Sequence, residues 1–230
     1  MPTQPVVVCI TGASGVIYAV RLLEVLRHTG HDVHLSISPS GQLVLRQELD
    51  VHVDLEDFHL SALMLDADKT ASDVGLEKTR ELAGVSSEDS SVLPVGARPV
   101  GEIHYHHHAD FFSPIASGSY LTQGMVICPC SGDTMSAVAT GRSENLIQRA
   151  AHVHLKERRP LILVPRETPL SLIQLDNMRR GCELGATILP AMPGWYHGVR
   201  STHDLVDFIV ARILDQLRIP HALMRRWGSP

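Results

Sequence analysis

Aromatic residues are scarce in this chain of 230 residues, at only 4% of the composition. Because few large rings are present, the core must be built from Leu, Val, Ile and Ala, which suits helices on parallel strands better than an all-β sandwich. Hydrophobic residues still make up 44% of the sequence. A chain of this length can therefore bury one substantial core without disulfides or metals.

Cysteine is also rare, and the sequence contains only Cys9, Cys128, Cys130 and Cys182. Three of them lie in or beside apolar runs, which predicts reduced, buried thiols and excludes a disulfide framework. Cys128 and Cys130 form a C-x-C pattern, and no second pair completes a zinc site. We therefore predict no metal site.

A basic surplus and long apolar runs are lacking as well. The formal net charge is −5 and the sequence pI is about 6.2, whereas a nucleic-acid partner requires a basic face. No run of 18 apolar residues occurs, and no charged segment precedes an apolar stretch at the N-terminus. We therefore expect no nucleic-acid partner, no membrane span, no signal peptide and a cytoplasmic location.

The sequence does contain short apolar, β-branched runs that alternate with helical patterns. The predicted strands cover residues 6–10, 33–37, 124–128, 161–164 and 187–189. The predicted helices cover residues 16–27, 40–49, 134–140, 145–155, 171–184 and 203–217. Ser40 is the expected cap of the second of these helices. We predict an α/β fold, a three-layer α/β/α doubly wound parallel sheet of Rossmann-like or flavodoxin-like type. Residues 1–230 form a single domain that ends in a C-terminal arm, 218–230.

One segment, approximately 66–108, interrupts this alternation. It is rich in Asp, Glu, Ser, Gly and His and has weak periodicity, which predicts a long polar insertion with one short helix near 74–82. His104, His106, His107 and His108 cluster at its end. A metal-binding or proton-handling role is one interpretation of the cluster, and a solvated polar loop is the other.

Ligands of doubly wound sheets bind beyond the carboxyl ends of the strands, and four chemically unusual segments fall there. The first, 11–15, carries Gly12 and Gly15, which allow a tight turn and close backbone approach to a phosphate at the following helix start. This is not G-x-G-x-x-G, and a plain strand–helix turn also explains it. The second is Ser38, which either bonds a ligand or caps a helix.

The third and fourth segments follow the next two strands. Residues 129–134 (Pro-Cys-Ser-Gly-Asp-Thr) can wrap a second part of a nucleotide, although a helix cap explains them equally well. In the fourth, Arg166 and Glu167 lie between two prolines that stiffen the loop. This pair offers a cation for phosphate and a group that can donate or accept a proton, or else it is a surface ion pair.

Further cations lie elsewhere in the chain. Arg149 and Lys156 are seven residues apart, about two helical turns, so they share a helix face. Tyr196 and Arg212 complete a possible anion site.

Several segments together resemble the UbiX family of flavin prenyltransferases. The matching segments are 11–15, 116–119, 128–131 with Thr134, 145–150, 155–160 (Leu-Lys-Glu-Arg-Arg-Pro), 166–169 (Arg-Glu-Thr-Pro), 193–197 and 226–228. The resemblance covers most of residues 6–60 and 110–228. Lys-Glu-Arg-Arg-Pro followed by Pro-Arg-Glu-Thr-Pro is its most specific part.

The resemblance implies transfer of a dimethylallyl group from dimethylallyl monophosphate to N5 and C6 of reduced FMN, without magnesium. The prenylated FMN serves a UbiD-type decarboxylase. Members of the family form dodecamers with sites at subunit junctions, so the resemblance implies a homo-oligomer.

The resemblance also implies roles for individual residues. Its FMN contacts are Gly12, Ala13, Ser14, Ser38, Ser131, Gly132, Asp133, Thr134 and Arg166. Its prenyl-phosphate contacts are Lys156, Tyr196, Arg212 and Arg149, with Phe111 as an aromatic wall. Its catalytic residues are Glu167, Ser14, Lys156 and Glu48, of which Glu167 handles a proton.

The chain departs from the family pattern at a few positions. Gln174 replaces a frequent His, Trp195 replaces a frequent Phe, and the 66–108 insertion is longer than in compact members. Two other functions stay open on the same fold. One is an FMN-dependent cysteine-type decarboxylase, and the other is a non-catalytic FMN-binding accessory subunit of a decarboxylase.

Overall fold

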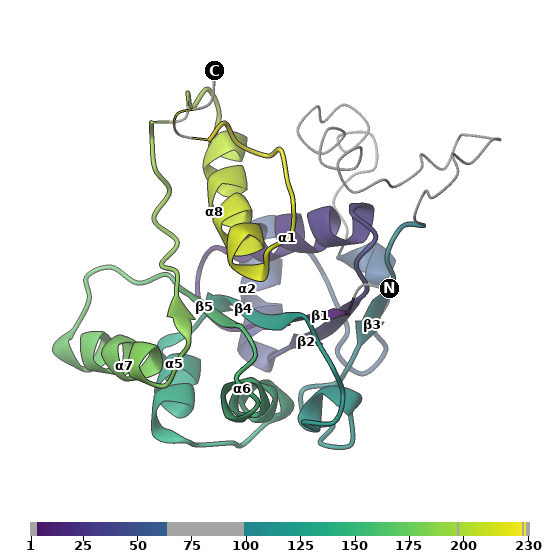
Figure 1. The fold of residues 1–230 in the computed structure, drawn as a ribbon. Helices are drawn as coiled ribbons and strands as arrows, with labels where there is room; N and C mark the ends of the chain where they lie inside the picture. The colour runs from purple at the N-terminus through teal and green to yellow at the C-terminus, as the bar shows by residue number, and fades with distance from the viewer. Residues whose placement is uncertain (1–3, 64–98, 197, 227, 229–230) are drawn as a thin grey trace.

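The computed structural model describes residues 4–63, 99–196, 198–226 and 228. Six strands form one parallel sheet in the order β3-β2-β1-β4-β5-β6. Helices cover both of its faces (Figure 1). This confirms the predicted three-layer, doubly wound α/β fold.

The central strands are apolar throughout because both of their faces are covered. In β1, β2, β4 and β5 every residue is buried, as expected for parallel strands between two helix layers. The strands are β1 (Val6–Ile10), β2 (Val33–Ile37), β3 (Ile103–Tyr105), β4 (Gly124–Cys130), β5 (Leu161–Pro165) and β6 (Thr187–Ile188).

Two helix layers enclose two separate apolar clusters. The helices are α1 (Val16–His28), α2 (Pro39–Leu49), α5 (Gly132–Thr140), α6 (Leu146–Lys156), α7 (Leu172–Glu183) and α8 (Thr202–Leu217). Helices α1, α2 and α8 pack on one face of the sheet, and α5, α6 and α7 lie on the other (Figure 1). Short 3-10 turns occur at η1 (Leu60–Ala62) and η2 (Pro114–Ala116).

Polar caps set the helix starts. The side chains of Ser38, Ser131, Asn145, Ser171 and Ser201 each accept a backbone N–H of the following turn. The prediction that Ser40 caps the second helix is therefore wrong. Ser38 holds that position because Pro39, which has no N–H to lose, fits the first helical turn.

The predicted insertion is corrected at its end. Residues 103–105 are not loop but β3, which pairs in parallel with β2. The strand escaped prediction because it is a short edge strand with histidine in its middle. The short helix predicted near 74–82 lies outside the described residues.

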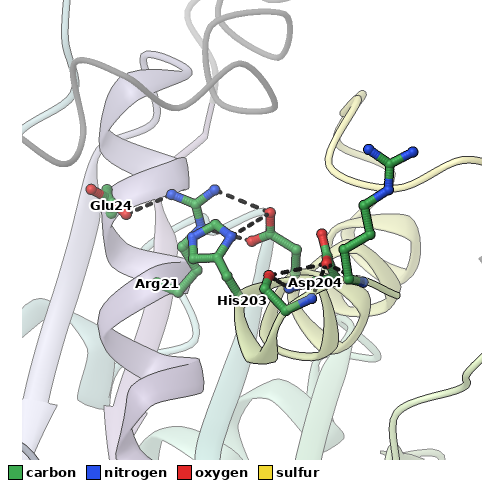
Figure 2. Close-up of polar contacts among 7 residues, drawn as sticks. Arg21, Glu24, His203 and Asp204 are labelled. Atoms are coloured by element: carbon green, nitrogen blue, oxygen red, sulfur yellow. Dashed lines mark hydrogen bonds and ion pairs between the residues drawn. The ribbon is translucent and has the colours of Figure 1, made fainter. Parts of the chain in front are cut away.

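A buried ion pair joins α1 to α8. Arg21 donates from Nε to Asp207 Oδ1 at 2.7 Å and from Nη2 to Asp207 Oδ2 at 3.2 Å. Its Nη1 donates to Glu24 one turn along α1 at 2.7 Å. Figure 2 shows the Arg21 guanidinium between its own helix and α8, beside His203. The contact fixes where α8 lies on α1.

The helices of the described residues include none that is both long and apolar enough to cross a membrane.

Candidate functional site

The site lies where the strand order reverses, between β1 and β4, which is the usual ligand position in doubly wound sheets. The loops after these two strands are bonded to each other. Thr11 donates from Oγ1 to the Pro129 carbonyl at 2.7 Å and accepts the Ser131 N–H at 2.9 Å. Thr11 is buried, so its hydroxyl locks the two loops into one surface.

The loop after β1 leaves no room for side chains. A Cβ on Gly12 would lie 2.4 Å from Ser40 Cβ, so the first turn of α2 closes on this loop. Gly15 has φ of 101°, the left-handed region that favours glycine. Gly12 is therefore required by close packing against Ser40, and Gly15 is required by its backbone conformation.

Two amides at the start of α1 already have an acceptor, contrary to expectation. Glu48, on α2, accepts the N–H groups of Gly15 and Val16 on one carboxylate oxygen, at 2.8 and 3.1 Å. A carboxylate is favourable at a helix N-terminus because of the helix dipole. An anionic ligand must therefore bind beside Glu48 and use other donors.

The starts of α2 and α5 supply such donors. Ser38 Oγ accepts the Gly41 N–H, and Ser131 Oγ accepts the Thr134 N–H while donating to Thr134 Oγ1 at 3.0 Å. Both serines are therefore helix caps in this structure. Gly132 is exposed, which leaves the first turn of α5 accessible. Asp133 is turned to Arg142, at 2.6 Å.

The loop after β5 brings a cation and a carboxylate to the same edge. Arg166 donates from Nε to the Ser14 carbonyl at 3.4 Å, so its side chain reaches the loop after β1. Glu167 Oε2 accepts the Gln174 Nε2–H at 3.1 Å. The loops after β1, β4 and β5 thus converge through Thr11, Ser131 and Arg166.

A small cavity opens behind this loop. It is lined by Cys130, Gly132, Met135, Pro165, Arg166, Glu167, Gln174, Asn177 and Met178. Burial raises the pKa of the Cys130 thiol, so it stays protonated and is no nucleophile at neutral pH. The polar groups at this cavity are Arg166, Glu167 and amides.

Lys156 lies near the amino ends of the strands, opposite the carboxyl ends that carry the loops described above. It ends α6 and pairs with Glu157 at 3.3 Å. Only four residues separate Lys156 from the start of β5. The last of them, Pro160, accepts the Met125 N–H on its carbonyl near the amino end of β4, so Lys156 lies close to the amino ends of the strands. A five-residue strand such as β5 spans roughly 16 Å. Within one chain, Lys156 and Glu167 therefore cannot hold the same small substrate.

Arg149 occupies the first turn of α6 and donates from Nε to the Ala116 carbonyl at 3.2 Å. It shares α6 with Lys156, as predicted from their spacing, but the helix runs away from the flavin-type loops. Phe111 lies in the loop after β3 and is 46% exposed.

Tyr196 precedes α8 and packs on the helix that carries Arg212. The ring of Tyr196 packs edge-on against Phe208 with centroids 5.8 Å apart, and Arg212 lies one turn further along the same helix face. Arg212 is held by Asp215, with Nη1 to Oδ2 at 2.7 Å.

Asp215 also ties down the C-terminal arm. Its Oδ1 accepts from Arg226 at 2.8 Å and from His221 at 3.1 Å. Burial opposes ionisation of Asp215, but these bonds outweigh it and its pKa lies below the ordinary value. Asp215 escaped prediction, although a carboxylate three positions after an arginine on a helix indicates an ion pair.

The histidine cluster forms a separate group between β2 and β3. His34 bonds His106 and the Tyr120 hydroxyl, each at 2.7 Å, and His104 stacks on it. Burial, with the nearby His106 and His104, lowers the pKa of His34 to about 4. His106 is thus packed against the sheet and is not a freely solvated loop residue. Within the described ranges, no three His, Cys, Asp or Glu side chains are placed to hold a metal ion.

Comparison with known proteins extends over the whole chain. A family model described as Flavoprotein matches residues 1–214. Flavin prenyltransferase UbiX of Pseudomonas aeruginosa is 44% identical over 226 residues, which are 98% of this chain and 95% of the relative. Flavin prenyltransferase UbiX of Methanocaldococcus jannaschii is 39% identical over 224 residues, which are 97% and 98%.

Solved structures agree with the sequence matches. The structure of AnUbiX (PadA1) in complex with FMN and dimethylallyl pyrophosphate superposes with a TM-score of 0.75 at 31% identity, covering 99% of both chains. A dodecameric FMN-dependent UbiX-like decarboxylase from Escherichia coli O157:H7 superposes with a TM-score of 0.74 at 30% identity, covering 98% of this chain and 100% of the other.

The cysteine decarboxylase TvaF is 12% identical with a TM-score of 0.52, covering 94% of this chain and 98% of the other, so it shares the fold alone. The likeness that extends to sequence is with flavin prenyltransferases. The chain therefore belongs to the UbiX family of flavin prenyltransferases.

Proposed function

We propose that this protein joins a dimethylallyl group from dimethylallyl monophosphate to N5 and C6 of reduced FMN. The observation that carries the proposal is the convergence of three strand-end loops, with Arg166 fixed across them against Ser14. Such a surface combines close backbone approach, helix-start amides and a fixed cation, which are the features that suit a flavin nucleotide.

FMN would contact the three loops through a defined set of groups. The proposed contacts are Gly12, Ala13, Ser14, Ser38, Ser131, Gly132, Asp133, Thr134 and Arg166. Because Glu48 occupies the start of α1, we assign the phosphate to Arg166 and to the accessible starts of α2 and α5. Asp133 is the weakest member of this set, since its carboxylate already pairs with Arg142 and would repel a phosphate.

The prenyl phosphate would be bound by cations that lie away from these loops in one chain. Arg212 lies on α8, against which Tyr196 packs through Phe208, and Lys156 with Arg149 lies on α6. Their separation supports a site completed by a second copy of the chain, and the similar protein from Escherichia coli is dodecameric. We therefore propose a homo-oligomer with shared sites. These cations would stabilise the charge that develops on the leaving phosphate.

Glu167 would handle the proton that must leave the flavin as the new bonds form. It is exposed in the single chain, and its oxygens accept from Gln174 and from the Thr168 N–H. Ser14 would lie near Glu167, because its carbonyl accepts from Arg166, the residue before Glu167. Glu48 would belong to the same polar site. Phe111 would cover the apolar prenyl group. The product would serve a UbiD-type decarboxylase in the cytoplasm.

Anaerobic incubation with reduced FMN and dimethylallyl monophosphate tests this function. Mass spectrometry of the extracted flavin should find FMN heavier by one prenyl unit. Unchanged flavin from folded, FMN-loaded protein would refute the proposal and favour an accessory FMN-binding subunit. Release of carbon dioxide from a cysteine-terminated peptide would instead favour the cysteine-type decarboxylase.

Subunit mixing tests whether the site is shared. Lys156→Ala and Glu167→Gln should each abolish prenyl transfer while FMN still binds. If the two residues come from neighbouring copies, assemblies reformed from equal amounts of both variants should regain about one quarter of the wild-type rate. If both come from one chain, no mixture contains an intact site and no activity returns.

A further inference from the structure

The first turn of α7 places one side chain between two functional elements. Gln174 accepts the Ser171 N–H on Oε1 at 2.8 Å, while its own N–H donates to Ser171 Oγ at 3.3 Å. These bonds form a capping box, which satisfies the first amides of the helix. Its Nε2 is then free to point back across the loop, where it donates to Glu167 Oε2 at 3.1 Å.

The capping box fixes which end of the amide faces Glu167. Oε1 of Gln174 accepts the Ser171 N–H. If the amide were flipped, its NH₂ group would face the Ser171 N–H and its oxygen would face the Glu167 carboxylate, so both hydrogen bonds would be lost. The N–H end is therefore held toward the carboxylate by a backbone bond of the helix. Gln174 Nε2 also lies 3.7 Å from the Cβ position of Gly132, so it bridges the loop after β5 and the start of α5.

Helix capping alone does not require an amide here. Glutamate serves the third position of a capping box as well as glutamine does. At residue 174, however, a glutamate would place a second carboxylate against Glu167, and two carboxylates so close repel each other. Glutamine and glutamate both serve as the cap, but only glutamine also donates a hydrogen bond to Glu167.

We propose that Gln174 is a positioning residue that holds the Glu167 carboxylate toward the flavin site. Thr168 N–H fixes the other oxygen, Oε1, at 3.3 Å, so both oxygens have a defined direction. The amide cannot lose its proton near neutral pH, so its N–H donor stays available to Glu167. This inference rests on the proposed proton-handling role of Glu167.

The conservative variant Gln174→Glu separates positioning from capping. It keeps the oxygen that accepts from Ser171, so thermal stability should change little. It replaces the donor to Glu167 with a like charge, so the limb of the pH–rate profile that disappears in Glu167→Gln should move up by about one pH unit. The shift should shrink at high salt because the pair is exposed.

Infrared pH titration of the flavin-free protein gives a readout independent of turnover. Subtracting the spectra of Glu167→Gln from those of the wild-type protein isolates the carboxyl signal of Glu167. Subtracting the spectra of the double variant Glu167→Gln/Gln174→Glu from those of Gln174→Glu isolates the same signal beside Glu at position 174, where protonation should occur at higher pH. The double variant Glu167→Gln/Gln174→Glu is the control, because the swapped amide and carboxylate restore one bond without the like-charge pair.

The outcomes separate the two levels of the proposal. If Gln174→Glu gives the wild-type pH profile and the wild-type infrared titration, Gln174 is only a cap and the positioning role is wrong. If the wild-type protein makes no prenylated flavin, the proposed function fails, whereas the infrared shift still decides whether Gln174 governs Glu167.

Discussion

The buried ion pair between α1 and α8 should make the stability of the protein sensitive to the loss of either partner alone. Arg21 and Asp207 side chains are 4% and 7% exposed, and two nitrogens of Arg21 bond the two carboxylate oxygens (Figure 2). Asp207→Ala leaves the guanidinium buried with its bond to Glu24. Breaking such a pair costs about 3–5 kcal/mol, and the surviving bond places the expected loss near 3 kcal/mol.

Replacing both partners should cost far less than replacing one. In Arg21→Met/Asp207→Leu the buried pair is gone and its volume is filled, so stability should exceed that of Asp207→Ala by about 2 kcal/mol. It should stay below wild type, because the Glu24 side chain, which is 15% exposed, loses its bond to Arg21. Arg179→Met is a matched control, because its pairs with Asp176 and Glu183 are exposed and should contribute about 0–1 kcal/mol.

Urea unfolding followed by circular dichroism, at one fixed protein concentration, measures these differences. The reasoning fails if Asp207→Ala loses no more stability than Arg179→Met, or if the double variant is as unstable as the single one. Because Arg212 lies on the same helix as Asp207, Asp207→Ala should also raise the KM for the prenyl donor more than that for FMN.

Three further predictions concern single residues. Burial lowers the pKa of His154 to about 4, so the unfolded chain takes up a proton at higher pH than the folded protein does. The stability that the neutral His154 contributes, about 3 kcal/mol, is therefore present above pH 6.5 and lost as the pH falls toward 4. In His154→Gln the urea midpoint should fall less steeply between pH 6.5 and 4, and an equally steep fall contradicts the assignment. Gly12→Ala must push Ser40 away, so fluorescence titration should show weaker FMN binding, and wild-type affinity would mean that the loop yields freely. Glu48→Gln should lower the melting temperature by a few degrees through the loss of about 0.5–1 kcal/mol at the start of α1, which calorimetry checks; an unchanged melting temperature would refute the role.

The sheet was predictable because its physics is local. Five of the strands are apolar runs bounded by turn residues, and their alternation with helical patterns leaves few topologies. The edge strand β3 was missed because its pattern, Ile-His-Tyr, carries no buried run. The cap of α2 was misplaced by two residues because Ser38 and Ser40 are chemically alike, and only the backbone distinguishes them.

The flavin-type loops were predictable for a similar reason. Glycines, small hydroxyls and Arg166 all follow strands, so the fold alone brings them to one edge. What the sequence could not give is the set of contacts between elements. Glu48 reaches the start of α1 from another helix, and Arg21 finds Asp207 at a separation of 186 residues. No spacing rule connects such pairs.

Lys156 and Glu167 mark the limit of reasoning by proximity in sequence. They are only eleven positions apart, and the resemblance assigns both to one catalytic site. Yet α6 precedes β5 and runs against it, so Lys156 must face the amino edge of the sheet while Glu167 follows the carboxyl edge. The predicted strand between them already required this separation. A catalytic role for both residues is therefore, from topology alone, an argument for two copies of the chain around one substrate.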